Sequence, residues 1–347
     1  MNLRTILSTR SLRVVAITAV FATSIGCGDP PTQNRAGLLV ASNDISLPGS
    51  TSRFDYQSLD ATNHTLWIAH LGDSVVIAVD VNTMTVTATV GDIASVHGVL
   101  AVADHGRVYA TATGTNEVVA IDAATHKVTA RVATGRFPDG LAYAPDDDLI
   151  LVTNKADGTV SVHNADTLEL VRTIDIAGET GNVAYDTTTK YGYVAGLPPN
   201  SLTQFDPAIG TIADTIDLPG CEGAHGVLID PSTQRAYVAC EDNARMLTID
   251  LTTTRLLATS NVGSGPDVLA FDPQSQRLYL AAESGDVAIF DTSTPEPRLL
   301  RQQNISNDAH SVAVDPNTHH VYFPLANANG APVLRITTLS ETSPLPG

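Results

Sequence analysis

Titratable side chains recur at one position of a repeat that runs through this sequence. Six of the seven members of this polar column can titrate, and Gly181 holds the remaining position; the six are Asp55, His97, Asp139, His225, Asp267 and His310. Neutral imidazole nitrogen and carboxylate oxygen are the atoms with which proteins bind divalent cations. The column therefore predicts a ligand-binding site that could hold a divalent metal ion, with the three histidines as candidate metal ligands.

The width of the space between these side chains decides among three interpretations. Metal to nitrogen bonds are about 2.0 to 2.1 Å long, so imidazoles from separate repeats can share one ion only across a narrow channel. Across a wide channel, the same residues would contact a larger polar ligand or surround a water-filled pore. The turns in which they lie also favour Asp and Gly for backbone reasons alone. Three histidines in one column are harder to explain by that preference.

A second set of polar residues follows the second strand of each repeat and is expected on the same face. Glu241 and Glu283 are its candidates for ligand binding, and they are accompanied by His70, Lys155 and Cys240. The fifth repeat is the densest, because its segment 221–226 would face residues 240–243. We expect this part of the surface to be the strongest local candidate for a site.

The chain contains three cysteines, Cys27, Cys221 and Cys240. Cys221 lies just before one strand of its repeat and Cys240 closes the next, so antiparallel pairing would bring both to the same end of the sheet. Disulfides persist in exported proteins, which meet oxidising conditions. We expect a disulfide between Cys221 and Cys240, with two separate buried thiols as the alternative.

The elements that position these residues are set by the repeat itself. Each copy contains an apolar strand, an aromatic strand, a strand that ends in Asp or Asn, and a strand rich in Thr and Val. A large side chain returns in the second strand at intervals of 42 to 44 residues, at Trp67, Tyr109, Leu151, Tyr193, Tyr237, Tyr279 and Tyr322. Such a period, built from short strands, is typical of a propeller or a β-solenoid. We predict an all-β fold, a seven-bladed β-propeller of four-stranded antiparallel blades, with the column at the mouth of its channel.

The ends of the chain predict how the ring closes. The seventh repeat supplies only three clear strands, over residues 309–315, 321–325 and 332–337. Residues 43–48 match the pattern of a fourth strand. An N-terminal strand that joins the last blade would remove an unpaired edge, so we predict closure in this way.

Two other columns are interpreted as structural. The large side chains of the second strands suit packing between blades. An Asp or Asn at the end of the third strand can accept a backbone N–H two residues later and hold the hairpin turn. We therefore exclude Asp80, Asp122, Asn164, Asp206, Asp250 and Asp291 from the site. His319 and His320 are expected in a solvated turn on the opposite face.

The N-terminus predicts export. Residues 1–26 carry three arginines and no acid, and the apolar run 14–25 is too short to span a bilayer comfortably. The run ends in Ser24-Ile25-Gly26-Cys27, which resembles the lipobox of bacterial lipoproteins, in which the Cys is lipidated. We expect a signal peptide over 1–26, a lipid-bearing Cys27 with a tether over 27–36, the propeller over 37–340 and a tail over 341–347. Ordinary signal cleavage, giving a soluble exported protein, is the alternative; either way we expect a periplasmic or outer-membrane location.

The charge of the chain bears on its partners. The formal net charge is -18, and removal of the three arginines in residues 1–26 brings it to -21. Nucleic-acid binding depends on clustered Lys and Arg, so this surface predicts no nucleic-acid partner. Attraction for cations or basic partners is easier to explain. The sequence also lacks a phosphate-binding glycine loop and a nucleophile elbow.

Several segments resemble a known family. Residues 149–154 (Leu-Ile-Leu-Val-Thr-Asn), followed by 158–162 (Gly-Thr-Val-Ser-Val), are similar to the YVTN-type, YncE-like β-propeller repeat. Residues 138–142 and 266–270 resemble the pattern with which its blades begin. The resemblance covers residues 44–337 and implies a seven-bladed propeller and an exported bacterial protein. Related propellers include lactonases and metal-dependent lyases, but no motif here carries their catalytic residues over.

The function that we expect is binding of a small polar ligand or a partner protein by a monomer, through the channel mouth. The alternative is a lactonase-like hydrolase or lyase in which His225 or His310 acts as general base beside a metal ion. A scaffold that uses its outer rim is a third option. In each case we expect contact with the membrane through the N-terminal lipid alone.

Overall fold

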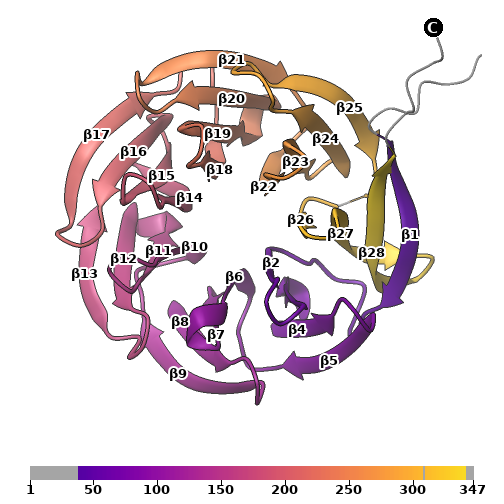
Figure 1. The fold of residues 1–347 in the computed structure, drawn as a ribbon. Helices are drawn as coiled ribbons and strands as arrows, with labels where there is room; N and C mark the ends of the chain where they lie inside the picture. Colours follow the sequence, from indigo (N-terminus) through magenta and orange to yellow (C-terminus); the bar gives the residue numbers. More distant parts are fainter. Residues whose placement is uncertain (1–37, 308, 341–347) are drawn as a thin grey trace, which may run out of the picture. The chain divides into compact units, whose positions relative to one another are not determined.

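The computed structural model describes residues 38–307 and 309–340, which form a ring of seven four-stranded antiparallel sheets around a central channel (Figure 1). The predicted seven-bladed propeller is therefore confirmed. The proposed signal peptide and lipid-bearing Cys27, with the tether 27–36 and the tail 341–347, lie outside the described residues. No helix in the described part of the chain is long and apolar enough to cross a membrane.

Each of the first four blades is a meander whose strands follow one another outward from the channel. Blade 1 contains β2 (Gln57–Asp60), β3 (Thr65–His70), β4 (Val75–Asp80) and β5 (Thr85–Val90), and blade 2 contains β6 (Val96–Val102), β7 (Arg107–Ala112), β8 (Glu117–Asp122) and β9 (Lys127–Ala133). Blade 3 contains β10 (Pro138–Ala144), β11 (Leu149–Asn154), β12 (Thr159–Asn164) and β13 (Leu170–Asp175), and blade 4 contains β14 (Glu179–Asp186), β15 (Tyr191–Leu197), β16 (Ser201–Asp206) and β17 (Thr211–Asp217).

The remaining blades continue this order, and the last one borrows its outer strand from the N-terminal end. Blade 5 contains β18 (Ala224–Asp230), β19 (Arg235–Cys240), β20 (Arg245–Asp250) and β21 (Arg255–Asn261), and blade 6 contains β22 (Pro266–Asp272), β23 (Arg277–Ala282), β24 (Asp286–Asp291) and β25 (Arg298–Asn304). Blade 7 contains β26 (Ala313–Val314), β27 (His320–Ala328), β28 (Ala331–Ser340) and β1 (Leu38–Ser46). Short 3-10 turns lie at η1 (Leu71–Asp73), η2 (Ala103–His105), η3 (Lys155–Asp157) and η4 (Glu241–Asn243).

The inner strands of blades 2 to 6 each contain an irregularity in register next to the polar column. In blade 3, Pro138 pairs with Asn154 and Leu141 with Val152, so Asp139 and Gly140 fall between the paired positions. Blades 2, 4, 5 and 6 show the same shift at the equivalent place. A bulge re-aims the side chains that it contains. This local irregularity directs the column toward the channel axis.

Glycines after the column residues allow neighbouring inner strands to approach closely. A Cβ on Gly226 would collide with the backbone carbonyl of Asp267 in the next blade. A Cβ on Gly98 would lie 2.3 Å from the carbonyl oxygen of Asp139. In both cases the added Cβ would lie far closer to the neighbouring backbone than a van der Waals contact permits. The absence of a side chain at these positions thus keeps the channel narrow where the polar column lies.

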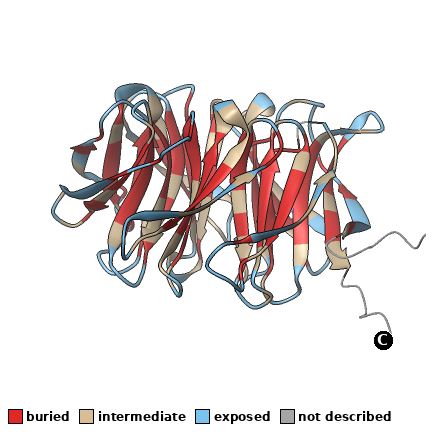
Figure 2. Cartoon of the chain, turned by 90° about the horizontal axis from the view of Figure 1, so that it is seen from above, coloured by how far each residue is buried: buried red, intermediate tan, exposed pale blue. Residues whose placement is uncertain are grey.

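The core lies between blades, as the repeat predicts. All seven large side chains of the second strands are at most 1% exposed, and Figure 2 shows buried residues along the strands and exposed residues in the loops. Tyr279 of blade 6, for example, belongs to the same apolar cluster as Val312 and Phe323 of blade 7. Because each cluster joins two adjacent blades, neither blade can bury its face alone.

The acids at the ends of the third strands hold turns, as predicted. Asp80 Oδ1 accepts hydrogen bonds from the backbone N–H groups of Asn82 and Thr83, each at 2.9 Å. A further acidic column, which we did not predict, does the same at the ends of inner strands. There the carboxylate of Asp272, which is fully buried, accepts backbone N–H groups and the hydroxyl of Ser275, and also contacts His319 Nδ1 at 2.6 Å. His319 is therefore anchored to the neighbouring blade, while its side chain remains half exposed.

The ring closes through β1, in agreement with the prediction. β1 pairs antiparallel with β28, from Leu38 opposite Ser340 to Ser46 opposite Val333. The side chain of Gln303 in blade 6 also bonds both the N–H and the carbonyl of Leu39, each at 3.0 Å. The N-terminal strand begins earlier than the expected residue 43, and the inner strand β26 is much shorter than the expected 309–315 because only Ala313 and Val314 pair with β27.

The two faces of the ring carry different parts of the chain. The mouth face is the one at which inner strands begin and second strands end. The opposite face carries the turns that join the first to the second strand and the third to the fourth. Because Leu38 pairs with Ser340 at the end of the third strand β28, the chain enters the propeller at the opposite face and reaches the mouth face only after Ser46.

Deletion of residues 37–50 tests the closure. We expect a sharply lower melting temperature and aggregation, because the edge of β28 would lose its partner and could pair with other molecules. The measurements are thermal denaturation and size-exclusion chromatography of the purified chain. A control substitution, Val40→Thr, retains the backbone pairing at an exposed position and should leave both nearly unchanged. A deletion variant with unaltered stability and solution size would refute the structural role of β1.

Candidate functional site

The polar column converges on a small cavity at the mouth face. The cavity has a volume of about 100 Å³ and lies at the axial end of the bulged inner strands. Its walls come from five of the seven blades, namely blades 1, 2, 3, 5 and 6. The lining residues are Arg53, Asp55, Tyr56, His97, Phe137, Asp139, Lys155, His225, Glu241, Asp267 and Glu283. Seven of the eight residues predicted to bind ligand are therefore brought together here, and the eighth, His310, faces Asp55. That they bind a ligand stays a prediction.

His225 lies between two carboxylates, with one ring nitrogen near each of them. Its Nδ1 is 3.1 Å from Asp267 Oδ1, and its Nε2 is 3.4 Å from Asp139 Oδ2. All three side chains are buried. Burial alone would lower the pKa of His225, but the two carboxylates outweigh it and raise the pKa to about 10. Burial likewise acts to raise the pKa of Asp139 and Asp267, and the imidazolium overcomes it and lowers both.

Asp55 lies in a very different environment, although it is equally buried. Its carboxylate oxygens lie 3.8 Å from Arg53 Nε and 4.0 Å from the nearest nitrogens of His97 and His310, beyond hydrogen-bonding distance. Burial raises the pKa of Asp55 well above its usual value, and the charges of Asp267 and Asp139 raise it further. Asp55 is thus a buried acid that its neighbours disfavour as an anion.

His97 forms one wall of the cavity with its lone pair directed inward. Its Nδ1 lies 2.8 Å from the carbonyl oxygen of Ser95, which must accept a hydrogen bond, so the proton is on Nδ1 and Nε2 is the acceptor in the neutral ring. Burial lowers the pKa of His97, which favours this neutral form. The ring packs edge-on against Phe137 at 5.2 Å between centroids.

Phe137 is an unusual residue for its backbone position. It has φ of 57°, whereas the equivalent positions of blades 5 and 6 hold Gly223 and Gly265 at positive φ. A bulky side chain in this region of backbone space is strained and is found most often at functional sites. Phe137 is nevertheless 39% exposed at the cavity. An exposed aromatic surface therefore lies beside the buried charges.

The rim of the cavity combines cations with acids. Arg53 donates two hydrogen bonds to Glu283, at 3.2 and 2.8 Å. Glu283 Oε2 lies in turn 3.8 Å from His310 Nδ1. Tyr56 donates to Asp267 Oδ1 at 3.1 Å and accepts from Asn182 Nδ2 at 2.5 Å. These contacts connect the rim of blade 6 to the inner strands of blades 1, 4 and 7.

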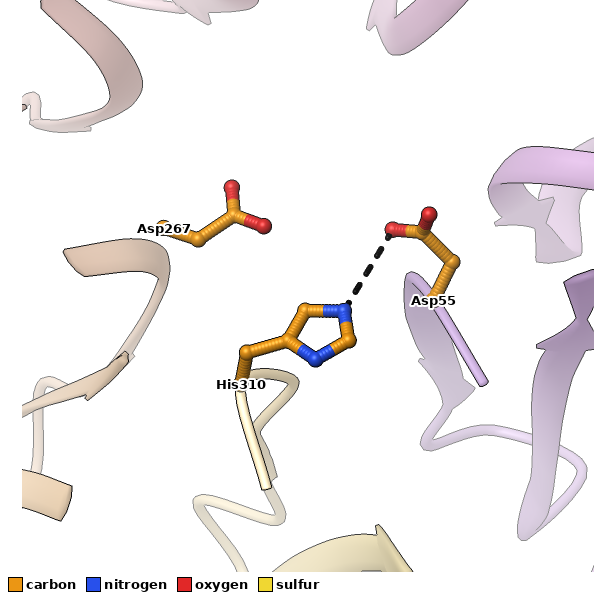
Figure 3. Close-up of side chains that lie close together, drawn as sticks. All are labelled: Asp55, Asp267 and His310. Carbon is orange, nitrogen blue, oxygen red and sulfur yellow. Dashed lines mark ion pairs between the residues drawn. The ribbon is translucent and has the colours of Figure 1, made fainter. Parts of the chain in front are cut away.

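The candidate metal ligands are only partly gathered. Asp55, Asp267 and His310 each offer a ligand atom, and these atoms all lie within 4.8 Å of one another. The three histidines do not form such a group among the described residues. His225 cannot join one without releasing a carboxylate, since both of its ring nitrogens face acids. Figure 3 shows the two carboxylates directed toward each other, with the His310 ring beside them.

The disulfide predicted from the sequence is present. Cys221 and Cys240 are bonded, with their Cα atoms 5.3 Å apart. The bond connects the loop before β18 to the end of β19, at the mouth face. The loop before β18 leads directly into Ala224 and His225, so the bond fixes the backbone that precedes the buried imidazole.

Other histidines have different surroundings. His70, expected on the mouth face, stacks on Phe54 at 4.1 Å and bonds the hydroxyl of Ser52 at 3.0 Å, outside the cavity lining. His105, on the opposite face, lies between Asp148 and Asp166, at 2.6 and 3.1 Å. This second arrangement has the same donor types as the cluster at the mouth.

Sequence analysis missed four residues of the mouth, namely Arg53, Tyr56, Phe137 and Asn182. Arg53 and Tyr56 flank Asp55, so their proximity in the chain was an available signal. Phe137 stands where the fifth and sixth repeats have glycine, and an alignment of the repeats at the following Pro138 and Pro266 would have exposed it. Nothing in the sequence indicates the contact between Asn182 and Tyr56, because it joins blades 1 and 4 across the axis.

The buried imidazolium predicts a characteristic pH dependence of stability. The folded pKa of about 10 exceeds the unfolded value near 6.5, so His225 stabilises the fold fully below pH 6.5 and less as pH rises to about 10. We expect the free energy of unfolding to fall across this range by on the order of 3 kcal/mol more in the natural chain than in His225→Gln. Denaturant unfolding with chelator present measures it, with His320→Gln as control. If the free energy of unfolding depends on pH in the same way in the natural chain and in His225→Gln, His225 is not the buried imidazolium that we infer. NMR titration of its imidazole is a second measurement of the same property.

Comparisons with known proteins agree with this architecture. A family model for YNCE-like β-propellers matches residues 62–347. A chain of Kuenenia stuttgartiensis hydrazine synthase is similar with a TM-score of 0.73 and 17% identity, over 83% of this chain and 97% of that one. A chain from a crystal structure of a mitotic checkpoint complex is similar with a TM-score of 0.74 and 11% identity, over 94% of this chain and 99% of that one. At these identities the likeness concerns the fold alone, and the comparison with curated proteins gave no match. The family match, over most of a seven-bladed ring, shows that the chain belongs to the YNCE-like β-propeller family.

Proposed function

We propose that this protein is an exported binding module that holds a small polar ligand, or a polar group of a partner protein, in the cavity at its mouth face. The observation that carries the proposal is the burial of Asp55, Asp139 and Asp267 around one small cavity. Burying like charges together opposes folding. Clusters of perturbed acids in a concave site are typical of functional sites.

A comparison with the opposite face strengthens this argument. Acids there, such as Asp80 and Asp272, accept hydrogen bonds from the backbone of turns and so contribute to the fold. The carboxylate of Asp55 accepts no hydrogen bond within the described residues, and it therefore has no comparable structural task. Phe137 adds an exposed aromatic surface at a strained backbone position beside the same cavity. Aromatic residues with neighbouring polar groups are enriched where proteins bind partners.

The catalytic alternative is weakened at one of its two candidate bases. A general base must be unprotonated to accept a proton, and the raised pKa of His225 keeps its imidazole protonated near neutral pH. Both of its ring nitrogens also face carboxylates. The hydrolase or lyase interpretation then depends on His310 alone, so binding without chemistry is the function that we propose.

The position of β1 fits attachment of the chain to a membrane through Cys27. β1 begins at Leu38 on the opposite face. The eleven residues 27–37 can span at most about 40 Å when fully extended. In our proposal, a lipid on Cys27 directs the opposite face toward the membrane, and the mouth face stays accessible to ligands and partners. The disulfide between Cys221 and Cys240 supports an oxidising compartment.

Photo-crosslinking tests binding at the mouth. Replacing Phe137 by the photoreactive analogue p-benzoylphenylalanine keeps an aromatic ring at the cavity, and the same analogue at Met84 is the control, because Met84 is 38% exposed on the opposite face. After irradiation in the cell envelope of the producing cells, we expect adducts from position 137 that are absent at position 84, and at least a several-fold loss of them in Asp267→Asn. Mass spectrometry identifies the adducts. Equal labelling at both positions, or none at 137, would argue against a binding site at the mouth.

The lipid anchor is tested separately. We expect the natural chain to incorporate an alkyne-tagged fatty acid and to partition into the detergent phase, because a lipidated Cys27 would make it amphiphilic. Cys27→Ser should do neither and should keep the same melting temperature, since residue 27 lies outside the propeller. Fatty-acid incorporation and phase partitioning are the measurements. An unlabelled natural chain in the aqueous phase would instead support the soluble exported form.

A further inference from the structure

We propose that Asp55, Asp267 and His310 bind one divalent transition-metal ion at the base of the mouth cavity. This deepens the proposed function and rests on it, since the ion would occupy the same cavity and supply part of the contact with the ligand. The set differs from the three histidines that the sequence suggested. It comes from three consecutive positions of the ring, blades 6, 7 and 1.

The geometry of the three side chains suits a shared ion. One ligand atom from each lies within 4.8 Å of the other two, and His310 Nε2 is 4.0 Å from Asp55 Oδ1. Ligand atoms around a metal ion with bonds of about 2.0 to 2.2 Å are separated by roughly 3 to 4.4 Å. Only a small inward movement of the side chains is therefore needed. Figure 3 shows both carboxylates directed into the space that the imidazole borders.

The surroundings of Asp55 are a second, independent observation that points to a cation in this cavity. Its side chain is only 3% exposed, and its carboxylate accepts no hydrogen bond from any described residue. A buried charged group without a hydrogen bond costs far more than a paired one. A cation between Asp55 and Asp267 would supply the missing partner and offset the repulsion between the two acids.

Asp267 is held in a position to serve as a ligand. Its Oδ1 receives the hydroxyl of Tyr56 and contacts Nδ1 of His225, both at 3.1 Å. Its Oδ2 takes part in no hydrogen bond within the described part of the chain. One oxygen thus fixes the orientation of the carboxylate, and the other remains for coordination.

His310 is supported by a chain of charged groups typical of metal-binding histidines. Its Nε2 faces Asp55, and its Nδ1 is 3.8 Å from Glu283 Oε2. Glu283 is fixed in turn by two hydrogen bonds from Arg53. At 3.8 Å Glu283 is too far for a hydrogen bond to the ring, so it acts through its negative charge, which makes the other ring nitrogen a better ligand. The positive charge of Arg53 is directed to Glu283, which limits its competition with an ion at Asp55.

The donor set indicates the class of metal. Two carboxylates and one imidazole suit Zn²⁺, Mn²⁺ or a related transition ion, whereas Ca²⁺ prefers six to eight oxygen ligands. Three protein ligands leave further coordination positions open toward the cavity. A polar group of the ligand, or water, would occupy them.

Isothermal titration with Zn²⁺ and Mn²⁺ on the metal-stripped propeller tests this set. We expect one ion per chain, with a rise in melting temperature of about 5 °C at one hundred times Kd. Asp55→Asn and His310→Gln should each weaken binding by more than about 100-fold, and Glu283→Gln by about 10 to 100-fold because it acts through His310. With chelator present, Asp55→Asn should melt no lower than the natural chain, since it removes a buried acid whose ionised form the charges of Asp139 and Asp267 disfavour. This comparison separates lost ligation from misfolding.

Two matched controls make the assignment specific. His105→Gln alters the cluster on the opposite face, where both ring nitrogens already contact carboxylates, and should leave the affinity unchanged. His320→Gln, at the start of β27 on the opposite face, should also leave it unchanged. Absence of stoichiometric binding, or a loss in His320→Gln or His105→Gln as large as in His310→Gln, would overturn the proposal. Photo-crosslinking at position 137 in chelator-treated envelopes distinguishes the two hypotheses: adducts without metal binding leave the binding function standing, and the absence of both removes it too.

Discussion

The close approach of neighbouring inner strands around the axis is the constraint on which the rest of the structure depends. At Gly98 and Gly226 there is no space for even a methyl group, because the next blade's backbone occupies it. Seven blades can therefore bring their first strands near enough for side chains from different blades to touch. The contact of Asn182 with Tyr56, and of His225 with both Asp139 and Asp267, exists only because the channel is this narrow.

The narrow channel brings the charged side chains of separate repeats together in one site. The bulges of blades 2 to 6 direct the column inward, and the surrounding sheets exclude much of the solvent that would screen the charges. The acids then separate into two kinds. Asp139 and Asp267 share a protonated imidazole and stay ionised, whereas Asp55 faces them without a close partner. Similar residues at equivalent positions thus acquire different protonation behaviour from their neighbours alone.

Much of the fold could be predicted from the sequence, because the pattern of one blade recurs in seven repeats. The period of Trp67 and its equivalents gives the number of blades, and the missing outer strand in the last repeat indicates closure by β1. The column itself could also be found, since Asp55 and its equivalents share one place in each repeat. Which side chains of the column contact one another could not be predicted. Whether His225 contacts Asp139 or a metal ion depends on distances across the channel, and the sequence does not give them. The contacts made by Tyr56 and Asn182 join blades that are separated by more than 100 residues, and no local pattern encodes them. The acids at the ends of inner strands, such as Asp272, were missed although a signal was present, since the polar segment 273–276 that follows Asp272 is typical of a turn.

The pairing of β1 with β28 also constrains when the protein can reach its final form. Leu38 is among the first residues of the propeller to be synthesised, and its partner Ser340 is made about 300 residues later. If the chain crosses a membrane from its N-terminus, the earlier blades can form as they emerge, but β1 has no partner until translocation is nearly complete. A prematurely terminated chain would keep an unpaired, aggregation-prone strand and would be a target for chaperones and proteases. The ring can thus close only when the whole propeller sequence, from β1 to β28, is present.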